Sequence, residues 1–456
     1  MNDTASRGQW SSRFGFILAA AGSAIGLGNI WRFPYTAGQN GGGAFVLVYL
    51  FFVAAIGIPV LLAELSVGRA TRRNPVGAYR TLAPRSRWPW LGAVGVACGF
   101  GILSFYSVVA GWTLGYGYYA VSGRFANGID SAASGAIFNS LVASPLWPAL
   151  LCAVFLLLTA LVVRGGVSSG IERASKILMP VFFVLLLLLA IRSLTLEGAG
   201  DGLRFFFHVD FSALVADPGV IGSALGQALF SLSLGMGAMI TYGSYLPKDE
   251  NVPVSAASVA FSDTAIAIVA GLMIFPALAH AGVDPQAGPG LVFVAMPTIF
   301  GAMPAGTIFG IVFYVLLAIA ALTSTISLLE VIVSYFVDER GWTREKAVWI
   351  ISAICFVIAV PSALSLGASS FFSNLPAGGF LGLMDLIFGK YGLTIGAFGI
   401  CVFVGWFWGV PKALAEIESS GHRLPAAPLW SFLVRWVCPV AVLLIFGLVV
   451  TGRANW

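Results

Sequence analysis

The stretch GSAIGLGNIWRFP, residues 22–34, decides which fold this chain can adopt. It lies within a long apolar run, residues 14–37, and places three glycines beside an asparagine, an arginine and a proline. A membrane-spanning helix satisfies its backbone groups internally, so opened backbone at membrane depth is expected only where it is buried in protein or lines a cavity. Close helix packing also uses glycine, but it requires none of the three other residue types. The stretch therefore predicts a broken first helix.

The rest of the chain has the composition of a membrane protein. Of its 456 residues, 59% are apolar and 9% are charged, whereas soluble domains carry about 25% charged residues. A helix needs about 20 apolar residues to cross a bilayer. Apolar runs of that order occur eleven times, at residues 14–37, 43–67, 89–121, 146–163, 171–193, 219–246, 255–280, 306–337, 346–366, 378–410 and 429–451. We therefore expect an all-α polytopic membrane protein with eleven transmembrane helices.

The basic residues indicate the orientation in the membrane, because cytoplasmic loops accumulate Lys and Arg. On the side of the N-terminus lie 18 of the 24, and four lie on the opposite side. Arg32 and Lys390 lie within or beside apolar runs and are left out of this comparison. We expect a cytoplasmic N-terminus and an external C-terminus in the cell (inner) membrane. Topology also accounts for the net charge of +5, so no nucleic-acid partner is expected.

Few residues could support redox or enzymatic chemistry. The five cysteines are scattered through apolar runs with no close pair along the sequence, and the three histidines lie near the ends of predicted segments. This pattern indicates neither a metal-ligand cluster nor a disulfide nor a haem site. We expect a protein that is not an enzyme and has no organic cofactor.

A second glycine cluster interrupts the sixth apolar run. It reads FSLSLGMG, residues 230–237, and again sets polar side chains beside the glycines. An interrupted helix exposes N–H groups at the start of one half and C=O groups at the end of the other, which suit an anion and a cation respectively. The two breaks predict a joint site for a carboxylate and a sodium ion.

Polar side chains at membrane depth are candidates for ion ligands. The eighth run contains the consecutive hydroxyls Thr323, Ser324 and Thr325, although such hydroxyls often bond to their own helix carbonyls. Asp263 is a stronger signal, since a charge at the centre of a membrane helix costs about 2.5 to 3.5 kcal/mol. Four other ionisable residues lie in apolar surroundings: Arg32, Glu64, Glu330 and Asp385. Glu64 could bind N–H groups of a broken helix or act in function, and Glu330 has no assignment.

Six stretches in the same order resemble the neurotransmitter:sodium symporter family. They are GSAIGLGNIWRFP (22–34), NGGGAF (40–45), GWTLGY (111–116), RGGVSSGIERASKILMP (164–180), SLSLGMGAMITYGSYL (231–246) and ALTSTIS (321–327). Within the family, the chain is similar to bacterial sodium-dependent amino-acid transporters with the leucine-transporter fold. The resemblance implies inverted repeats at 14–193 and 219–410, with segments one and six broken at the midplane. An extra helix at 429–451 and a cytoplasmic N-terminal segment, 1–13, would lie outside the repeats.

The resemblance also implies two sodium sites, a substrate site and two gates. The first sodium site would use the Ala24 carbonyl and the side chains of Asn29, Ser231 and Asp263, together with the substrate carboxylate. The second would use the carbonyls of Gly22, Ile25 and Ala320 and the hydroxyls of Thr323 and Ser324. The substrate would contact Ala24, Gly26, Leu27, Gly28, Ile102, Tyr106, Phe230, Ser231, Ser233, Met236 and Leu328. Arg32 and Asp385 would form the outer gate, and Arg7 with Asp338, backed by Trp10, the inner one.

Asp263 departs from the commonest pattern of the family, in which many relatives carry asparagine and bind chloride nearby. A fixed carboxylate supplies the negative charge that chloride would otherwise bring to a low-dielectric cavity holding two sodium ions. We therefore predict chloride-independent symport by alternating access.

Met236 is a flexible side chain that adapts to varied partners, which favours hydrophobic L-amino acids, aliphatic and aromatic, as substrates. A small-aliphatic preference and a non-transporting amino-acid sensor are the alternatives. The expected partners are the amino acid and the lipid bilayer, with no obligate protein partner.

Gly170 and Pro180 flank the cytoplasmic end of the fifth run and allow two interpretations. They resemble a glycine-to-proline motif that lets this end unwind in some bacterial relatives. They could equally mark a helix boundary followed by a kink.

Overall fold

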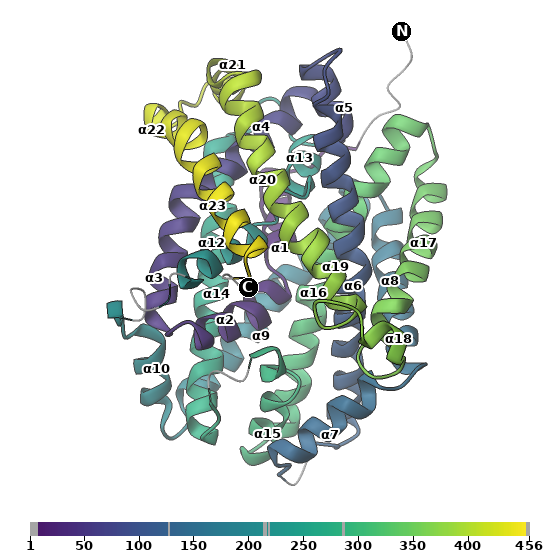
Figure 1. Ribbon diagram of the computed structural model, residues 1–456, viewed down its shortest axis with the longest axis vertical. Coiled ribbons are helices and arrows are strands. Elements are labelled where there is room, and N and C mark those ends of the chain that lie inside the picture. Colours follow the sequence, from purple (N-terminus) through teal and green to yellow (C-terminus); the bar gives the residue numbers. More distant parts are fainter. Residues whose placement is uncertain (1–7, 126–127, 213–216, 218, 285–287, 453–456) are drawn as a thin grey trace.

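The computed structural model describes residues 8–452, apart from 126–127, 213–216, 218 and 285–287. Throughout these residues the regular secondary structure is helical, and no strand occurs. Figure 1 shows long helices that run roughly along the long axis of the molecule. The expected all-α class is confirmed.

Most of the predicted apolar runs are helices long enough to cross a membrane. Nine helices of the described residues are long and apolar enough to cross a membrane, and one bent pair adds a tenth. The nine are Gly43–Thr71 (α3, η2, α4), Pro89–Val121 (α6), Trp147–Arg164 (α8), Val167–Leu194 (η3, α9), Val252–Ala281 (α14), Gly306–Arg340 (α16), Arg344–Leu364 (α17), Phe380–Phe407 (α19, η5, α20, η6) and Ala427–Val450 (α22, η7, α23).

The two remaining predicted segments are the broken ones. Segment one is the bent pair, α1 (Arg13–Ala24) followed by η1 (Gly28–Arg32) and α2 (Phe33–Gln39). Segment six consists of α12 (Gly219–Ser231) and α13 (Ala238–Gly243), which are separately too short to span. These helices agree with the predicted runs to within four residues at either end, and the expected count of eleven is consistent with them.

Short helices connect the spans at the two ends of the bundle (Figure 1). At one end lie α5 (Pro75–Leu82) and α21 (Val410–Ile417), and at the other lie α7 (Ser131–Val142), α10 (Ala199–Phe207) and α15 (Ala295–Ala302). Local sequence explains where α5 begins. The Asn74 side chain accepts hydrogen bonds from the N–H groups of Val76 and Gly77, and Pro75 occupies the first helical turn. We call the two ends the α5 end and the α7 end.

The helices at the centre differ from those at the periphery in how much apolar surface they bury. In the most apolar stretch, 78% of α6 and 72% of α16 is buried, against 33% of the α9 span and of the α23 span. Beyond its first turn, α9 exposes apolar side chains, as Phe183, Val184 and Ile191 illustrate. The outer helices thus present a lipid face, while α6 and α16 form the core around the site.

The five cysteines are buried and free. Although none is close to another along the sequence, Cys401 on α20 and Cys438 on α23 belong to helices that pack side by side. The Cys438 thiol donates to the Ala55 carbonyl at 3.8 Å.

Candidate functional site

The predicted break in segment one is present. Helix α1 ends at Ala24, Ile25 adopts extended backbone (φ −73°, ψ 111°), and the axis bends by 50° before η1 continues. Gly26 lies at the bend, where an added Cβ would come within 2.4 Å of Ser324 Oγ and 2.8 Å of Tyr106 Oη. A side chain at this position would force these two hydroxyls to move, so the glycine serves close approach as well as backbone freedom.

The predicted break in segment six is also present. Between α12 and α13, residues Ser233, Gly235 and Gly237 have positive φ values of 54°, 80° and 77°. The freed N–H of Gly235 donates to Oε1 of Glu64 at 2.7 Å, and Glu64 is buried. This contact agrees with the structural interpretation of Glu64, in which the carboxylate satisfies opened backbone.

Three of the expected ligands of the first sodium site meet between the two breaks and α14. Asn29 Nδ2 donates to Asp263 Oδ1 at 2.8 Å and lies 3.1 Å from Ser231 Oγ. The Ser231 hydroxyl donates to the same carboxylate at 2.8 to 2.9 Å. All three side chains are at most 1% exposed. The site thus gathers hydroxyl and carboxylate oxygens around one buried negative charge, as a sodium ion requires.

The amide of Asn29 is oriented away from a cation in this arrangement. Its Oδ1 accepts the N–H of Gly26 at 3.0 Å while Nδ2 faces Asp263. For Asn29 to bind a cation beside that carboxylate, the amide must turn so that Oδ1 replaces Nδ2. The Gly26 contact would be exchanged in the same step, which links ion binding to the break in segment one.

The expected ligands of the second sodium site also lie together. The Thr323 hydroxyl is 3.4 Å from the Ile25 carbonyl and 3.0 Å from the Ala320 carbonyl. Ser324 Oγ lies 3.5 Å from the Ile25 carbonyl and 3.4 Å from that of Ala320. A Cβ placed on Gly22 would lie 3.4 Å from Thr323 Cβ, so this glycine borders the same oxygen cluster. Both hydroxyls also donate to carbonyls of their own helix, α16, which is the alternative noted for them from the sequence.

A small cavity of about 340 Å3 lies between the breaks and α6. Of the expected substrate contacts, all line it except Leu27, which borders the cavity described next, and Ser231, which lies in the first ion cluster. Its apolar walls are Ile102, Phe230, Met236 and Leu328.

Tyr106 stands at the polar end of this cavity. Its hydroxyl accepts the N–H of Leu27 at 3.0 Å, so two of the expected substrate contacts bond to each other here. Ser233 Oγ donates to the Ser23 carbonyl at 2.9 Å across the two broken segments. The cavity therefore has one polar side, formed by broken backbone, and one apolar side, formed by α6, α12 and α16.

A second cavity of about 730 Å3 shares Gly28, Tyr106 and Phe230 with the first and is also lined by Arg32 and Asp385. The Arg32 guanidinium lies 4.2 Å from the centre of the Phe230 ring, a cation–π contact. The expected outer-gate residues, Arg32 and Asp385, therefore line the same cavity, which adjoins the small one.

Trp10 is buried at the α5 end, below the small cavity on the side away from Arg32 and Asp385. Its Nε1 donates to the Tyr242 carbonyl at 3.1 Å, and its ring packs edge-on against Tyr242 with centroids 5.2 Å apart. Asp338 accepts the N–H and Nδ2 of Asn74 at 3.0 and 3.1 Å. Arg7, the other expected inner-gate residue, lies outside the described residues.

Glu330 has partners that sequence reasoning did not assign. It forms an ion pair with Arg344, the first residue of α17, and accepts the Tyr245 hydroxyl at 2.6 Å. Tyr245 in turn accepts the N–H of Trp10 through its carbonyl at 3.3 Å. The buried carboxylate thus ties α16 and α17 to the segment that closes the α5 end.

Segment five is helical through the glycine-to-proline region. Val167–Glu172 forms a π-helical turn (η3) that contains Gly170, and Pro180 lies inside α9, Arg173–Leu194. A Cβ on Gly170 would lie 2.2 Å from the Val162 carbonyl. Pro180 thus lies within the helix and not at its boundary, where it removes one backbone hydrogen bond a short distance after the irregular turn.

Two further polar residues border the first ion cluster. The Tyr49 hydroxyl lies 3.4 Å from Asp263 Oδ2, and Gln227 donates to the Gly28 carbonyl at 2.9 Å. The side-chain oxygen of Gln227 is buried and has no hydrogen-bond partner among the described residues. Both are polar residues in apolar runs, so a complete search for such residues would have found them. The Ser23 carbonyl could not be found that way, because backbone oxygens leave no mark in the sequence.

Comparison with known proteins gives consistent results. The sequence profile described as "Sodium:neurotransmitter symporter family" matches residues 7–128 and 141–454. The chain is 41% identical over 439 residues to the "Uncharacterized sodium-dependent transporter YhdH" of Bacillus subtilis, covering 96% of each protein. It is 35% identical over 453 residues to an "Uncharacterized sodium-dependent transporter" of Haemophilus influenzae, covering 96% of this chain and 97% of that protein. The crystal structure of MhsT in complex with L-phenylalanine superposes with a TM-score of 0.89 at 47% identity, covering 97% of this chain and 99% of MhsT.

Proposed function

The chain belongs to the sodium:neurotransmitter symporter family, and from that membership we propose that it imports hydrophobic L-amino acids with sodium and without chloride. It is a multi-pass membrane transporter with the leucine-transporter fold, not an enzyme, and its transport is coupled to sodium. The observation that carries the proposal is the position of the buried Asp263 carboxylate between two helix breaks beside a small, partly apolar cavity.

The cavity supports a single hydrophobic amino acid as substrate. Its polar side, at the breaks, suits a carboxylate and an ammonium group, because free N–H and C=O groups of interrupted helices attract opposite charges. Its apolar side would receive the substrate side chain. Met236 follows Gly235 and precedes Gly237, both at positive φ, so this wall can adjust to aliphatic and aromatic side chains. MhsT, the structural relative, was solved with L-phenylalanine.

Two sodium ions are proposed, one at each oxygen cluster. In the first, the substrate carboxylate would complete the ligands supplied by Ala24, Asn29, Ser231 and Asp263. In the second, the ligands would be the carbonyls of Gly22, Ile25 and Ala320 with the hydroxyls of Thr323 and Ser324. Sharing a ligand between ion and substrate couples their binding free energies, so each raises the affinity for the other.

Chloride independence rests on the fixed charge of Asp263. The side chain accepts bonds from Asn29, Ser231 and Tyr49, and no ion pair with a Lys or Arg is found for it among the described residues. It can therefore balance a sodium ion that would otherwise require an anion.

Alternating access would follow from exchange of the two closures. In this proposal, the cavity bordered by Arg32 and Asp385 would give access from one end of the bundle, and Trp10 with its partners would close the α5 end. With the positive-inside orientation, the α5 end is cytoplasmic and the N-terminal segment 1–13 carries part of its closure. The proposed repeats are 14–193 and 219–410, with the helix at 429–451 outside them.

Uptake in proteoliposomes tests this function. Purified protein is reconstituted, a sodium gradient is imposed, and labelled L-phenylalanine uptake is measured with chloride or gluconate as the anion. We expect equal sodium-driven uptake in both media. Competition by a panel of amino acids should show inhibition by leucine, isoleucine and tryptophan.

The alternatives give different results in the same system. Inhibition by alanine and glycine but not by aromatic amino acids would favour a small-aliphatic transporter. Sodium-dependent binding without uptake or counterflow would indicate a sensor. Uptake that stops in gluconate would contradict the role given to Asp263.

A further inference from the structure

A groove opens on the membrane-facing side of the molecule between α4 (Ile58–Thr71), α14 and the connection that follows α21. Its volume is about 1380 Å3, part of which is open to the surroundings. Phe261 and Val254 of α14 line it and are 75% and 45% exposed, and Leu62 and Ala257 complete its apolar wall. It is separate from the cavities near the helix breaks, with which it shares no lining residue.

The groove has an apolar part and a polar end. The α14 span begins at Val252, and its N-cap Asn251 and the loop residues His422 and Arg423 line the end of the groove. From Val254 to Phe261, a helix rises about 10 Å, at 1.5 Å per residue. That distance fits within one leaflet of a bilayer whose hydrocarbon core is about 30 Å thick. The apolar part therefore lies at the depth of acyl chains and the polar end at the depth of headgroups.

The polar end carries positive charge that the described ion pairs do not neutralise. Arg423 and His422 are exposed, and Arg423 takes part in no ion pair of the described residues. Two neighbouring carboxylates are paired with cations, Glu250 with Arg13 and Glu416 with Arg69 and Lys248, while Glu418 accepts only the N–H of Leu424. An anion at this end would meet the Arg423 guanidinium, which lines the groove.

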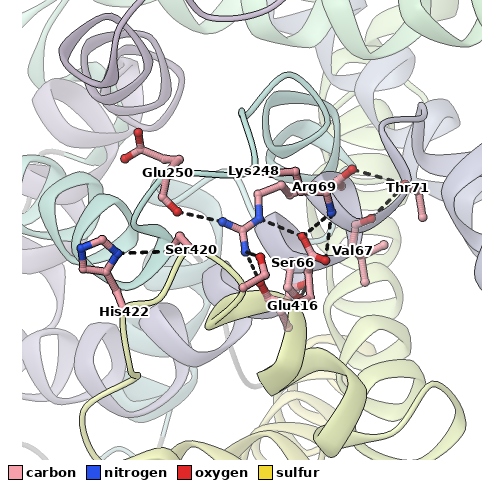
Figure 2. Close-up of polar contacts among 12 residues, drawn as sticks. Ser66, Val67, Arg69, Thr71, Lys248, Glu250, Glu416, Ser420 and His422 are labelled. Atoms are coloured by element: carbon pink, nitrogen blue, oxygen red, sulfur yellow. Dashed lines mark hydrogen bonds and ion pairs between the residues drawn. The ribbon is translucent and has the colours of Figure 1, made fainter.

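The loop that carries Arg423 is held in place by a buried arginine (Figure 2). Arg69, in the last turn of α4, is 0% exposed and donates to Glu416 Oε1 at 2.9 Å, to Ser419 Oγ at 3.0 Å and to the Glu250 carbonyl at 2.8 Å. Figure 2 also shows Ser420 bonded to His422 at 3.3 Å, next to this cluster. The cationic end is thus anchored to the wall of the groove, so binding there costs little ordering of the loop.

We propose that the groove binds one anionic glycerophospholipid from the leaflet at the α5 end. An acyl chain fills the apolar part beside Phe261, because a hollow facing the bilayer core favours hydrocarbon over water. The phosphate lies at the polar end, where the planar guanidinium of Arg423 donates charge-assisted hydrogen bonds to its oxygens. Anionic lipids attract basic side chains at such depths by about 1 kcal/mol per Lys or Arg.

Lipid binding to the full-length protein tests the proposal. Phosphatidylglycerol and phosphatidylcholine with the same acyl chains are titrated into detergent-solubilised protein, and bound lipid is counted by native mass spectrometry. We expect one phosphatidylglycerol to bind in preference to phosphatidylcholine. Arg423→Gln should weaken phosphatidylglycerol binding about fivefold, the equivalent of the 1 kcal/mol above. Ala257→Trp should fill the apolar wall and remove binding of both lipids.

Lys412→Gln is the matched control. Lys412 is exposed on α21, the helix that precedes the connection, and it does not line the groove. It should leave lipid binding unchanged, and sodium-dependent amino-acid binding should remain in every variant, which verifies folding. Equal binding of the two lipids, equal losses in Arg423→Gln and Lys412→Gln, or full binding in Ala257→Trp would each overturn the proposal. Binding of glycerol phosphate as tight as that of phosphatidylglycerol would also overturn the proposal, because the acyl chain would then contribute nothing. A lipid-free dimer in the mass spectrum would overturn it too, since a second copy of the chain would then occupy the groove.

Discussion

Asn29 Nδ2 donates to Oδ1 of Asp263 at 2.8 Å, so the break in segment one bonds directly to the middle of α14. Both residues are 0% exposed. A buried carboxylate that is surrounded by neutral donors is a costly arrangement unless a cation joins it. The pair therefore links the two parts of the proposal: a sodium ion that neutralises Asp263 also acts on the backbone that borders the substrate cavity.

Asp263→Asn should make transport depend on chloride. Without the fixed charge, a site that holds sodium needs another anion, since ion pairing is strong in a buried environment. Phenylalanine uptake in gluconate medium should fall at least about tenfold, which corresponds to 1.4 kcal/mol, and chloride should restore part of it. Wild-type protein, measured alongside, should be unaffected by the anion. A variant that transports equally well in gluconate would show that Asp263 does not supply the charge.

Thr323→Val should raise the sodium concentration needed for half-maximal substrate binding. Valine keeps the shape but removes an oxygen close to the Ile25 and Ala320 carbonyls, and a bond to a charged group contributes about 1.5 to 3 kcal/mol. We expect a shift of about tenfold or more, measured by substrate binding across a sodium titration.

Thr325→Val is the control for this shift. The Thr325 hydroxyl bonds to Thr159 at 2.8 Å and to the Leu322 carbonyl at 3.0 Å, away from the oxygen cluster. It should lower thermal stability without changing the sodium requirement. The same sodium shift in both variants would argue against a second site at Thr323.

The sequence predicted those features that each leave a local mark. The glycine clusters and Asp263 stand out in apolar runs, and both helix breaks were predicted from the glycine clusters. Arg69 lies just beyond the second apolar run, where nothing in the local sequence indicates burial, yet it is fully buried in α4 because its partners Glu250 and Glu416 lie 181 and 347 residues away. Glu330 stayed unassigned for a similar reason, since Tyr245 lies in another segment. Long-range partners are set by packing, which no local pattern encodes.

Gly26→Ala should weaken substrate binding. The added methyl group would overlap Ser324 Oγ at 2.4 Å and Tyr106 Oη at 2.8 Å, so the break would have to shift at both polar groups. Substrate affinity should fall more than about tenfold, with protein still folded by size-exclusion chromatography. Gly117→Ala in α6 is the control, because its Cβ would meet no atom nearer than 3.9 Å. Retained affinity in Gly26→Ala would mean that the bend does not shape the cavity.

Arg344→Gln should destabilise the α5 end by leaving the Glu330 carboxylate buried without its ion-pair partner. Breaking such a pair from one side costs about 3 to 5 kcal/mol, and Glu330 is 0% exposed. The thermal midpoint should drop sharply in Arg344→Gln and recover in the double variant Glu330→Gln/Arg344→Gln, which removes both charges. If the double variant is as unstable as the single one, then the lost hydrogen bond from Arg344 to the Val163 carbonyl, and not the ion pair, dominates.

Pro180→Ala should slow the release of sodium without weakening substrate binding. Proline lacks the N–H that would bond to the Lys176 carbonyl inside α9, so segment five is weakened just after the π-helical turn at Gly170. Alanine restores one helix hydrogen bond, worth about 0.5 to 1.5 kcal/mol, and opening this end should become about five times slower. Stopped-flow measurement of sodium release after dilution gives the rate, and equilibrium binding gives the affinity. Pro276→Ala is the matched control, because Pro276 also lies inside a helix but on α14. An unchanged rate in Pro180→Ala, or equal slowing in both variants, would favour a static kink over an opening of segment five.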